Sequence, residues 1–529
     1  MRIKHLAVAA LALASSGVGA AACRAQPTPR PTLIVMVSVD QMRADLLTRF
    51  APAYTGGLRL LLDRGMRFDN ATHDHAVTHT AAGHASLSTA SFPMHSGIVA
   101  NGWLEKREGK WVSVYAVEDR ASPIIGFPEL PGRSPANLKR TGLADWVLAA
   151  DPEARVVSLS GKDRAAITMA GKSRGEVYWL NARLGRFITS EYYRGDYPGW
   201  VVRFNEDVMP RILADSVWES TVPLDQRRLA RPDAASYEGD GVHTTFPHLA
   251  AQEVAPGGGQ AAFNAWALRS PRADQAVLQL AEVAVRATSL GMRGHTDYLA
   301  LSLSSTDYVG HAFGPLSQEQ LDNLVRLDRE LGEFFDFLDG AVGRGRWIVG
   351  FSADHGVLTM PEYLAEQGDT LARRVNSGVM RQQVLQAVQQ ATSAEGDSAT
   401  EARRVAEALR ASGLVAAAYT HEALVAGEAP DTFAVLFRHS YYPGRGPGWL
   451  SRFGVEIRFP EETLVAGATG TSHGSPYLYD RHVPFVVMGS GVEAGQRLEA
   501  VRSVDLAPTL ASLAGIPVPD DVDGRPVNR

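Results

Sequence analysis

The sequence lacks two features that restrict the class of protein. It has a single cysteine, Cys23, in 529 residues, so an intramolecular disulfide is excluded and the fold must be stabilised by its core and by bound groups. It also has no dense run of Lys and Arg, and acidic residues outnumber basic ones by 58 to 52, for a formal net charge of -6. This charge balance argues against nucleic acid as a partner.

Long hydrophobic runs are scarce as well, and the one at the N-terminus has the layout of a secretory leader. Two basic residues precede an apolar stretch from Leu6, and small residues follow as far as Cys23. We therefore predict a signal peptide over residues 1–25 and export to the periplasm, with no permanent transmembrane span, because the stretch is short and contains Ser and Gly. Cys23 leaves two alternatives open, a lipid anchor or ordinary signal cleavage, since Ala20 stands where lipoprotein sites usually have Leu.

Apolar residues make up 45% of the chain, enough for a sizeable core. Five short apolar runs have the composition of buried parallel strands, at 32–40, 155–160, 298–305, 346–354 and 483–491. Between them lie helical patterns, the clearest with apolar residues at Leu321, Leu324, Leu331, Phe335 and Leu338. The sequence thus predicts an α/β fold with a mostly parallel central sheet flanked by helices.

Two stretches depart from this alternation of strands and helices. Residues 175–290 are rich in Trp, Tyr, Arg and Pro, and we interpret them as an insertion over the sheet. Residues 360–465 contain a helical segment near 380–391 and a Gly/Pro-rich tract, and are typical of a second subdomain. We expect one α/β domain over residues 30–529 with these two inserted segments.

Ionisable side chains follow four of the predicted strands. In chain order they are Asp40, then Lys162 and Arg164, then Asp307 and His311, and finally Asp354 and His355. A single Asp at a strand end is often only a helix N-cap. Because the carboxyl ends of parallel strands form the ligand crevice of an open α/β sheet, four such ends together predict a shared site.

The residue types indicate which ligand this site binds. Asp and His beside a hydroxyl suit zinc, whereas a set of oxygens alone would suit magnesium or calcium. Asp307 and His311 are four residues apart and can bind one ion from a single loop or turn, while Asp354 and His355 are adjacent. We therefore expect two metal ions, with His473 of "TSHGSPYLYD" as the third ligand of one of them.

The stretch "VTHTAAGHASLSTAS", residues 77–91, contains several hydroxyls and two imidazoles but no acidic residue. Taken by itself it fits three interpretations: a histidine-lined metal site, a nucleophile at the start of a helix, or a polar turn.

Six motifs in order between residues 32 and 475 decide among these interpretations. Together they resemble the alkaline phosphatase superfamily, and most closely its exported threonine-nucleophile branch, the PafA-type phosphatases. The motifs are "TLIVMVSVDQMRADLL", "THTAAGHASLSTASFPMHSGIVANGW", "SGKDRAAI", "STDYVGHAFGP", "SADHG" and "GTSHGS".

The resemblance implies a zinc-dependent phosphate monoester hydrolase that acts through a phosphothreonine intermediate. By its motifs, one zinc ion would be held by Asp40, Asp354 and His355 together with the nucleophile Thr80, and the other by Asp307, His311 and His473. Asn101 would donate its amide to a phosphate oxygen, and His79 and His84 would support the site. Thr80 would begin a helix, where the positive helix end and a metal ion both favour its alkoxide. The chain departs from the family in having Ala81 and Ala82 where Gly-Pro is usual.

Lys162 and Arg164 match the pair that distinguishes monoesterases of this superfamily from its phosphodiesterases. The charges of two zinc ions are balanced by three Asp carboxylates and the alkoxide, so the pair leaves a positive site that suits a phosphate monoester dianion. The alternatives are a nucleotide pyrophosphatase/phosphodiesterase of the same superfamily and a non-catalytic zinc- or phosphate-binding relative. A loose Walker A pattern at residues 166–173 suggests an ATPase less well, and the Cys/Ser motif of sulfatases is absent. The sequence predicts no oligomeric state.

Overall fold

The computed structural model describes residues 30–392, 397–428 and 431–527. The predicted signal peptide and Cys23 lie outside these residues. None of the helices in the described ranges is long and apolar enough to cross a membrane.

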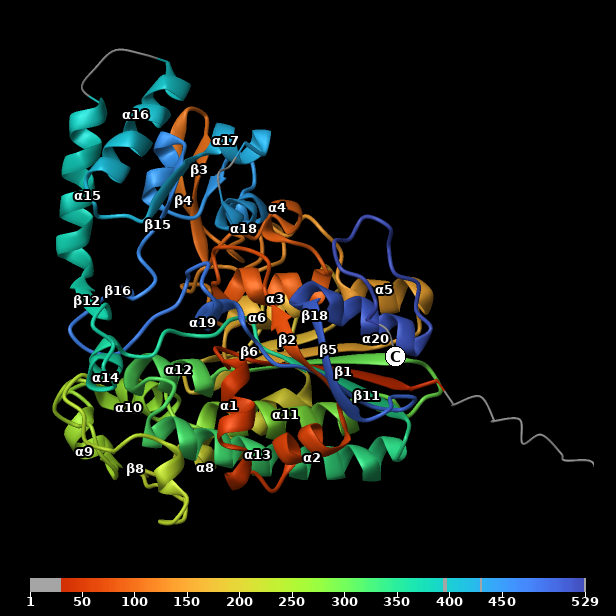
Figure 1. Cartoon of the computed structure of the whole chain (residues 1–529). Helices are drawn as coiled ribbons and strands as arrows, with labels where there is room; N and C mark the ends of the chain where they lie inside the picture. Colours follow the sequence, from red (N-terminus) through yellow and green to blue (C-terminus); the bar gives the residue numbers. More distant parts are fainter. Residues whose placement is uncertain (1–29, 393–396, 429–430, 528–529) are drawn as a thin grey trace, which may run out of the picture.

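A nine-stranded sheet forms the centre of the molecule (Figure 1). Its strand order is β18-β2-β17-β11-β1-β10-β5-β6-β7. In this order the strands span Gly495–Arg502, Met66–Thr72, Phe485–Gly489, Trp347–Ser352, Leu33–Val39, Asp297–Leu303, Val156–Ser160, Glu176–Asn181 and Arg186–Ile188. The middle of the sheet, from β11 to β6, is parallel, and β1, β10 and β11 are buried along their whole length. The prediction of a mostly parallel central sheet is confirmed.

The prediction for the fifth apolar run, 483–491, was wrong in direction. Strand β17 forms within it but pairs antiparallel with both β11 and β2. The cause lies in how the chain reaches β17: Phe485 at its start pairs with Ser352 at the end of β11, so β17 begins at the carboxyl edge of the parallel strands. A chain that starts its next strand at that edge runs antiparallel and needs no crossover helix, whereas a parallel strand would need one.

The central sheet lies between two layers of helices (Figure 1). Alternate residues of β1 belong to the cores on its two faces. Val35 and Val37 pack in one hydrophobic core and Ile34 and Met36 in another. The first layer contains α2 (Gly57–Arg64), α11 (Arg272–Ala287) and α13 (Gln318–Leu338), and the second contains α3 (Thr80–Thr89), α5 (Leu143–Ala150) and α20 (Leu506–Ala514). The apolar stripe predicted over residues 321–338 is buried in α13.

The stretch 175–290 is not wholly an insertion over the sheet. Strands β6 and β7 at its start belong to the central sheet, and α11 at its end packs on that sheet beside β10. The high aromatic content concealed a core strand, because β6 buries Tyr178 and Trp179. The prediction of an insertion can hold only for the residues between β7 and α11.

The stretch 360–465 has a hydrophobic core of its own, which includes Val384, Val405, Leu409 and Val455. The predicted helix near 380–391 lies within α15 (Ser377–Thr392), which packs against α16 (Ser398–Ala411). Two small two-stranded sheets complete the stretch. They pair β12 (Arg373–Asn376) with β16 (Thr463–Ala466) and β13 (Ala417–Thr420) with β15 (Val455–Arg458).

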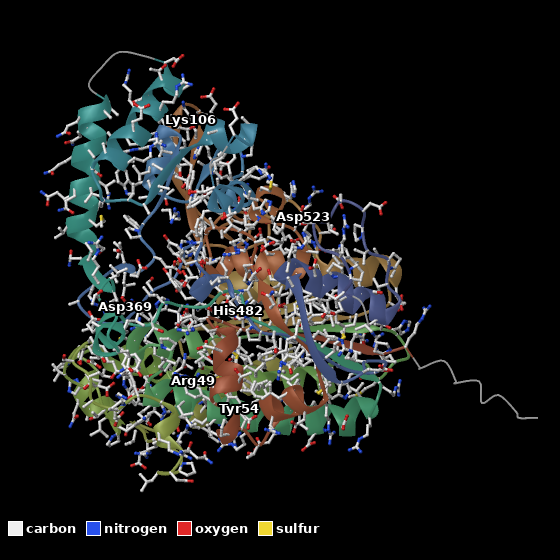
Figure 2. The ribbon with its side chains drawn as sticks, in the orientation of Figure 1. Arg49, Tyr54, Lys106, Asp369, His482 and Asp523 are labelled. Carbon is white, nitrogen blue, oxygen red and sulfur yellow. The ribbon has the colours of Figure 1, made fainter. Side chains whose placement is uncertain are left out.

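This subdomain is joined to the main body by a hairpin of β3 (Gly102–Arg107) and β4 (Lys110–Tyr115). The short strand β14 (Arg445–Gly446) adds to the edge of β3. Lys106 on β3 accordingly lies among the helices of the subdomain (Figure 2). The division into one domain with two insertions stays a prediction.

The loose Walker A pattern at 166–173 does not have the structure that an ATPase requires. Its first residues lie inside α6 (Asp163–Met169), and the pattern ends in the turn before β6. A phosphate-binding loop needs a helix after the motif, and here a strand follows.

Candidate active site

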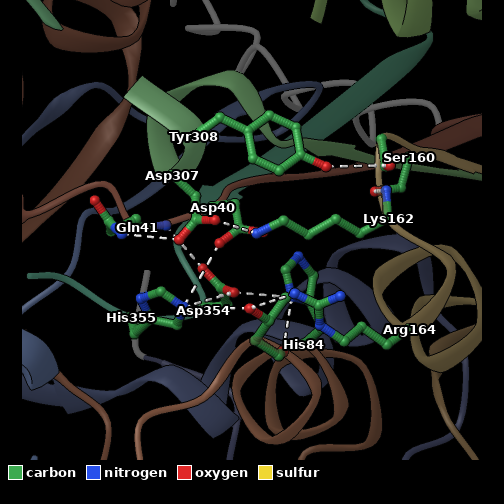
Figure 3. Close-up of polar contacts among 12 residues, drawn as sticks. Asp40, Gln41, His84, Ser160, Lys162, Arg164, Asp307, Tyr308, Asp354 and His355 are labelled. Atoms are coloured by element: carbon green, nitrogen blue, oxygen red, sulfur yellow. Dashed lines mark hydrogen bonds and ion pairs between the residues drawn. The ribbon is translucent and has the colours of Figure 1, made fainter. Parts of the chain in front are cut away.

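Side chains from four strand ends converge at the carboxyl edge of the sheet (Figure 3). Asp40 follows β1, Asp354 follows β11, Asp307 lies in the first turn of α12 (Ser305–Phe313) after β10, and Lys162 precedes α6 after β5. All four side chains are almost completely buried. Lys162 Nζ lies 2.6 Å from Asp40 Oδ2 and also contacts Asp307 Oδ2. The ammonium group thus bridges two carboxylates that come from different strands.

Asp40, Asp354 and His355 form one group of potential metal ligands. His355 Nε2 lies 3.5 Å from Asp40 Oδ1 and 3.4 Å from Asp354 Oδ2. One ligand atom from each of the three residues lies within 4.8 Å of the other two, and all three side chains are buried. The structure therefore brings together the three residues of the first predicted zinc site.

The second group is centred on Asp307. Its Oδ1 lies 3.2 Å from His311 Nε2 and 3.8 Å from His473 Nε2. The set in which every pair of ligand atoms lies within 4.8 Å is Asp307, His355 and His473, because the His473 ring stacks on His355 with centroids 3.5 Å apart. His311 and His355 thus both adjoin this group, and the assignment of His311 to the second ion stays a prediction.

The rings of His355, His311 and His473 all point Nε2 toward the carboxylates, because Nδ1 of each ring is hydrogen-bonded to a backbone carbonyl. The Nδ1 distances are 2.9 Å from His355 to Gly356 O, 2.8 Å from His311 to Thr471 O and 2.7 Å from His473 to Thr78 O. An Nδ1–H that donates to a carbonyl fixes the tautomer and leaves Nε2 with a lone pair for a metal ion.

The carboxylates themselves also fit a cation. Within the described part of the chain, both oxygens of Asp40 and Oδ2 of Asp354 are buried and accept no well-directed hydrogen bond. Burial, and then the charges of Asp307 and Asp354, raise the pKa of Asp40 well above its usual value. Burial would lower the pKa of Lys162, but the charges of Asp307 and Asp40 raise it. Carboxylates that repel one another, with Lys162 as the cation between only two of them, are a fitting donor set for zinc together with the Nε2 lone pairs.

Thr80 lies at the first position of α3 and is 1% exposed. Its Oγ1 lies 3.5 Å from His355 Nε2, beside the first group of ligands. The chain has Ala81 and Ala82 where the family usually has Gly-Pro, and α3 nevertheless begins at Thr80. His79, the residue before the helix, has an extended backbone. His84, one turn later, brings Nδ1 within 2.9 Å of Thr80 O and 3.1 Å of Asp354 Oδ2, which agrees with a supporting role.

Arg164 and Asn101 reach the same hydroxyl region. Arg164 Nη2 donates to Thr80 Oγ1 over 3.4 Å, and its side chain enters from the same side as Lys162 (Figure 3). Asn101 Oδ1 accepts the backbone N–H of Ala81 at 2.8 Å, which leaves the Nδ2 group free to act as a donor. The structure thus places these predicted phosphate-binding side chains around the start of α3.

Sequence reasoning missed Gln41, which supports both ligand groups. Its backbone N–H donates to Asp354 Oδ1 at 3.0 Å and its Nε2 donates to Asp307 Oδ1 at 2.8 Å. Gln41 adopts a φ of 69°, which is uncommon for a residue with a side chain. No motif of general chemistry predicts this role, and only its position after Asp40 could have suggested it.

Sequence reasoning also missed the residues that hold Arg164. The Tyr115 hydroxyl lies 3.4 Å from Arg164 Nη1 and donates to Asp163 Oδ1 at 2.6 Å. The other oxygen of Asp163 accepts from Arg133 Nε, also at 2.6 Å. These three residues come from separate segments, so spacing in the sequence gave no signal.

Residues 34–445 match the family of type I phosphodiesterases and nucleotide pyrophosphatases. The chain belongs to this family. The resemblance to the alkaline phosphatase superfamily is confirmed by curated relatives that are named alkaline phosphatases. PhoV of Synechococcus elongatus is 31% identical over 93% of this chain and 92% of its own length. PafA of Elizabethkingia meningoseptica is 31% identical, with 94% and 93% covered, and PhoK of a Sphingomonas species is 32% identical, with 93% and 90% covered.

The fold of this family member agrees with a crystal structure of wild-type PafA. The TM-score is 0.85 at 29% sequence identity, over 95% of this chain and 99% of that chain.

A substitution at Gly83 can test whether α3 must pack directly against the backbone of Asp354. A Cβ on Gly83 would lie 2.0 Å from the backbone oxygen of Asp354, so we expect Gly83→Ala to displace either α3 or Asp354. Overpacking of this kind costs about 1–3 kcal/mol of unfolding free energy, and a misplacement of about 1 Å near reacting groups costs about a hundredfold in rate. Thermal unfolding and kcat/KM on an aryl phosphate measure the two effects. Gly340→Ala is the matched control, because its added Cβ would have no atom within 4 Å apart from its chain neighbours and its own helix backbone. Equal behaviour of the two variants would contradict the close approach.

Proposed function

We propose that this chain is an alkaline phosphatase, a phosphate monoester hydrolase that uses two zinc ions and Thr80 as its nucleophile. One observation carries the proposal. A buried threonine hydroxyl at the start of a helix lies beside both a group of three metal ligands and an arginine. A hydroxyl nucleophile is activated in such an environment, because a coordinated metal ion and a nearby positive charge both favour its alkoxide.

Asp40, Asp354 and His355 would hold one ion, and Asp307, His311 and His473 the other, with His355 between the two groups. When bound, two divalent ions supply Lewis-acid stabilisation of the attacking and leaving oxygens of an in-line displacement. The buried carboxylates and the fixed Nε2 atoms supply the donors that zinc prefers.

The residues around Thr80 carry out the rest of the reaction. Thr80 Oγ1 loses its proton to water and bonds to phosphorus as the bond from phosphorus to the ester oxygen breaks, which forms a phosphothreonine. The alcohol leaves with the ester oxygen and takes up a proton from water. A water molecule then cleaves the phosphothreonine, which releases inorganic phosphate and restores the Thr80 hydroxyl. The N-terminus of α3 and the Asn101 amide stabilise the negative charge of the phosphoryl oxygens, because helix N-terminal N–H groups and side-chain amides are hydrogen-bond donors.

Lys162 and Arg164 favour a monoester over a diester. A monoester dianion has one more charged nonbridging oxygen than a diester, and both cations enter the crevice from one side (Figure 3). Arg164 is held by Tyr115, so its guanidinium is oriented before substrate binds. Prearranged donors contribute most where charge develops in the transition state.

The second candidate is a phosphodiesterase, and the description of the matching family favours it. A non-catalytic zinc- or phosphate-binding relative is a third, but it would have no need for Thr80 in this position. We further propose that residues 1–25 direct export to the periplasm. The choice between a lipid anchor at Cys23 and ordinary cleavage stays open.

We expect chelation to abolish phosphatase activity and to lower the melting temperature, and we expect added zinc to restore both. The reason is that three buried carboxylates repel one another without cations, so bound metal stabilises the fold. Rates on an aryl phosphate and thermal unfolding, before and after dialysis against a chelator, measure the two effects. Calcium serves as the control ion and should restore neither, and full activity at metal contents near zero by elemental analysis would refute the two-zinc site.

We expect Thr80→Ser to retain measurable turnover, because it keeps the attacking oxygen. Thr80→Ala should lose about a thousandfold or more in kcat without losing the fold or the bound zinc. Steady-state rates, melting temperature and zinc content separate these effects. Near-normal turnover of Thr80→Ala, or phosphate trapped on another hydroxyl, would show that the nucleophile has been misassigned.

The double variant Lys162→Ala/Arg164→Ala separates the two leading functions. Hydrogen bonds to charged groups contribute about 1.5–3 kcal/mol each, so the monoester should lose about ten- to a hundredfold in kcat/KM for each removed side chain. A diester carries an organic group at one of these oxygens and gains less from the pair. We therefore expect the monoester-to-diester ratio to fall by about a hundredfold or more, measured on aryl and bis-aryl phosphates.

Comparable losses on both substrates, with zinc content and fold intact, would mean that the pair serves the site generally. The phosphodiesterase function would then be favoured.

A further inference from the structure

A cavity of about 410 Å³ opens next to the candidate active site and is used by none of the steps above. It lies between the subdomain 360–465 and the loop that carries His473. Its walls come from α15, from the short helix Trp449–Phe453, from β15 and β16, and from residues 472–480. In Figure 1, α15 and β16 lie at the left edge of the molecule, where the subdomain meets the main body.

The wall of this cavity is mostly apolar and aromatic. Its principal apolar side chains are Met380, Val384, Trp449, Ile457, Phe459 and Tyr477. Such a surface favours apolar ligand groups, because each Å² removed from water contributes about 25 cal/mol.

Three of the four Asp, Glu and Arg residues in the wall contact protein partners, and the fourth, Arg381, is exposed on α15. Glu456 accepts from Ser451 and contacts His421, Arg458 donates to the Tyr477 hydroxyl at 2.8 Å, and Asp480 accepts from Ser475. Among the buried polar atoms of Glu456, Arg458 and Asp480, Arg458 Nε and Asp480 Oδ1 have no hydrogen-bond partner. The rest of the interior offers a ligand mainly apolar contacts.

The cavity adjoins the candidate active site through two histidines. His473 and His79 line it. His473 Nε2 lies 3.8 Å from Asp307 Oδ1, in the second ligand group. Thr80, beside the first ligand group, directly follows His79 in the chain. In an in-line displacement the leaving oxygen lies opposite the nucleophile, so the alcohol part of the ester is directed to the Asp307 and His473 side.

A second cavity, of about 310 Å³, adjoins the site at Lys162 and Arg164 and is also lined by Arg133 and Arg183. Apolar residues such as Ile124, Leu130 and Trp179 also line it. Lys162 and Arg164, the cations that suit phosphoryl oxygens, thus lie in the wall of this second cavity and not in that of the first.

We propose that the apolar cavity binds the alcohol part of the substrate and makes the enzyme selective for phosphate monoesters of aromatic alcohols. This proposal rests on the phosphatase function proposed above. A volume of 410 Å³ lies near the lower end of the range of about 300–1,000 Å³ for ligand sites, which fits a group of two fused aromatic rings.

The test compares phenyl phosphate with 2-naphthyl phosphate, which have leaving groups of similar acidity and differ by one ring. Burying the second ring should give the wild-type enzyme about tenfold higher kcat/KM on the naphthyl ester. Trp449→Ala should lose most of this preference, because kcat/KM should fall more on the naphthyl ester than on phenyl phosphate. Trp111→Ala is the matched control, because Trp111 lies on β4, is 39% exposed and does not line the cavity. It should keep the wild-type ratio.

A second variant guards against misfolding of Trp449→Ala. Ser377 lines the cavity but is exposed, so Ser377→Trp should fold and change the naphthyl-to-phenyl ratio. Val379→Trp adds the same bulk at a position that is 51% exposed and outside the cavity, and should not change it. Equal ratios in the wild type, in Trp449→Ala and in Ser377→Trp would overturn the proposal while leaving the phosphatase function intact.

Binding of 2-naphthol, followed by ligand-observed NMR on the full chain, needs no turnover. We expect saturable binding to the wild type and to Trp111→Ala, weakened at least several-fold in Trp449→Ala. If this pattern occurs but neither phosphate ester is hydrolysed, the proposed function fails and the apolar site stands. Naphthol binding that Trp449→Ala does not weaken would place the ligand elsewhere and overturn the proposal.

Discussion

The mutual repulsion of three buried carboxylates is the constraint on which the site depends. Asp40, Asp307 and Asp354 come from three neighbouring parallel strands and meet where water is excluded. Isolated charges are costly to bury, and the Lys162 ammonium compensates only two of the three carboxylates directly. Further cationic charge would relieve the remaining repulsion, and the fixed Nε2 atoms of the surrounding histidines are placed to hold a metal ion that supplied it.

The sheet topology creates this convergence. Strands β11, β1 and β10 are adjacent and parallel, so the residues that follow them share one edge. Helix α3 then packs against the backbone of Asp354 at Gly83, a contact that brings Thr80 to the same place. The antiparallel β17 completes the arrangement, because the loop leading into it carries His473 back across the strand ends.

Much of this arrangement could be predicted from the sequence, for a physical reason. Buried parallel strands leave continuous apolar runs, and the ionisable residue directly after each run, such as Asp40 or Asp354, is therefore placed by topology alone. The direction of β17 could not be predicted, since an apolar run has no signal for strand direction. Gln41 and Tyr115 were missed because their roles depend on tertiary contacts and, for Gln41, on a backbone conformation that has no sequence pattern. Composition alone predicts an insertion at β6, because the strand is rich in aromatic residues. The structure instead places β6 in the central sheet, where these aromatic side chains are buried.

The subdomain 360–465 gives the site an asymmetry that the central sheet alone would not provide. The sheet supplies the carboxylates and, through the loops after β5, the cations Lys162 and Arg164 on one side. The subdomain supplies Trp449, Ile457 and Phe459 on the other side, beyond His473. A phosphate ester has the same division into a charged phosphoryl group and an alcohol part. Because the apolar wall contributes no groups to phosphoryl transfer, its side chains can vary without disturbing the chemistry, and the choice of alcohol can change while the reaction stays the same.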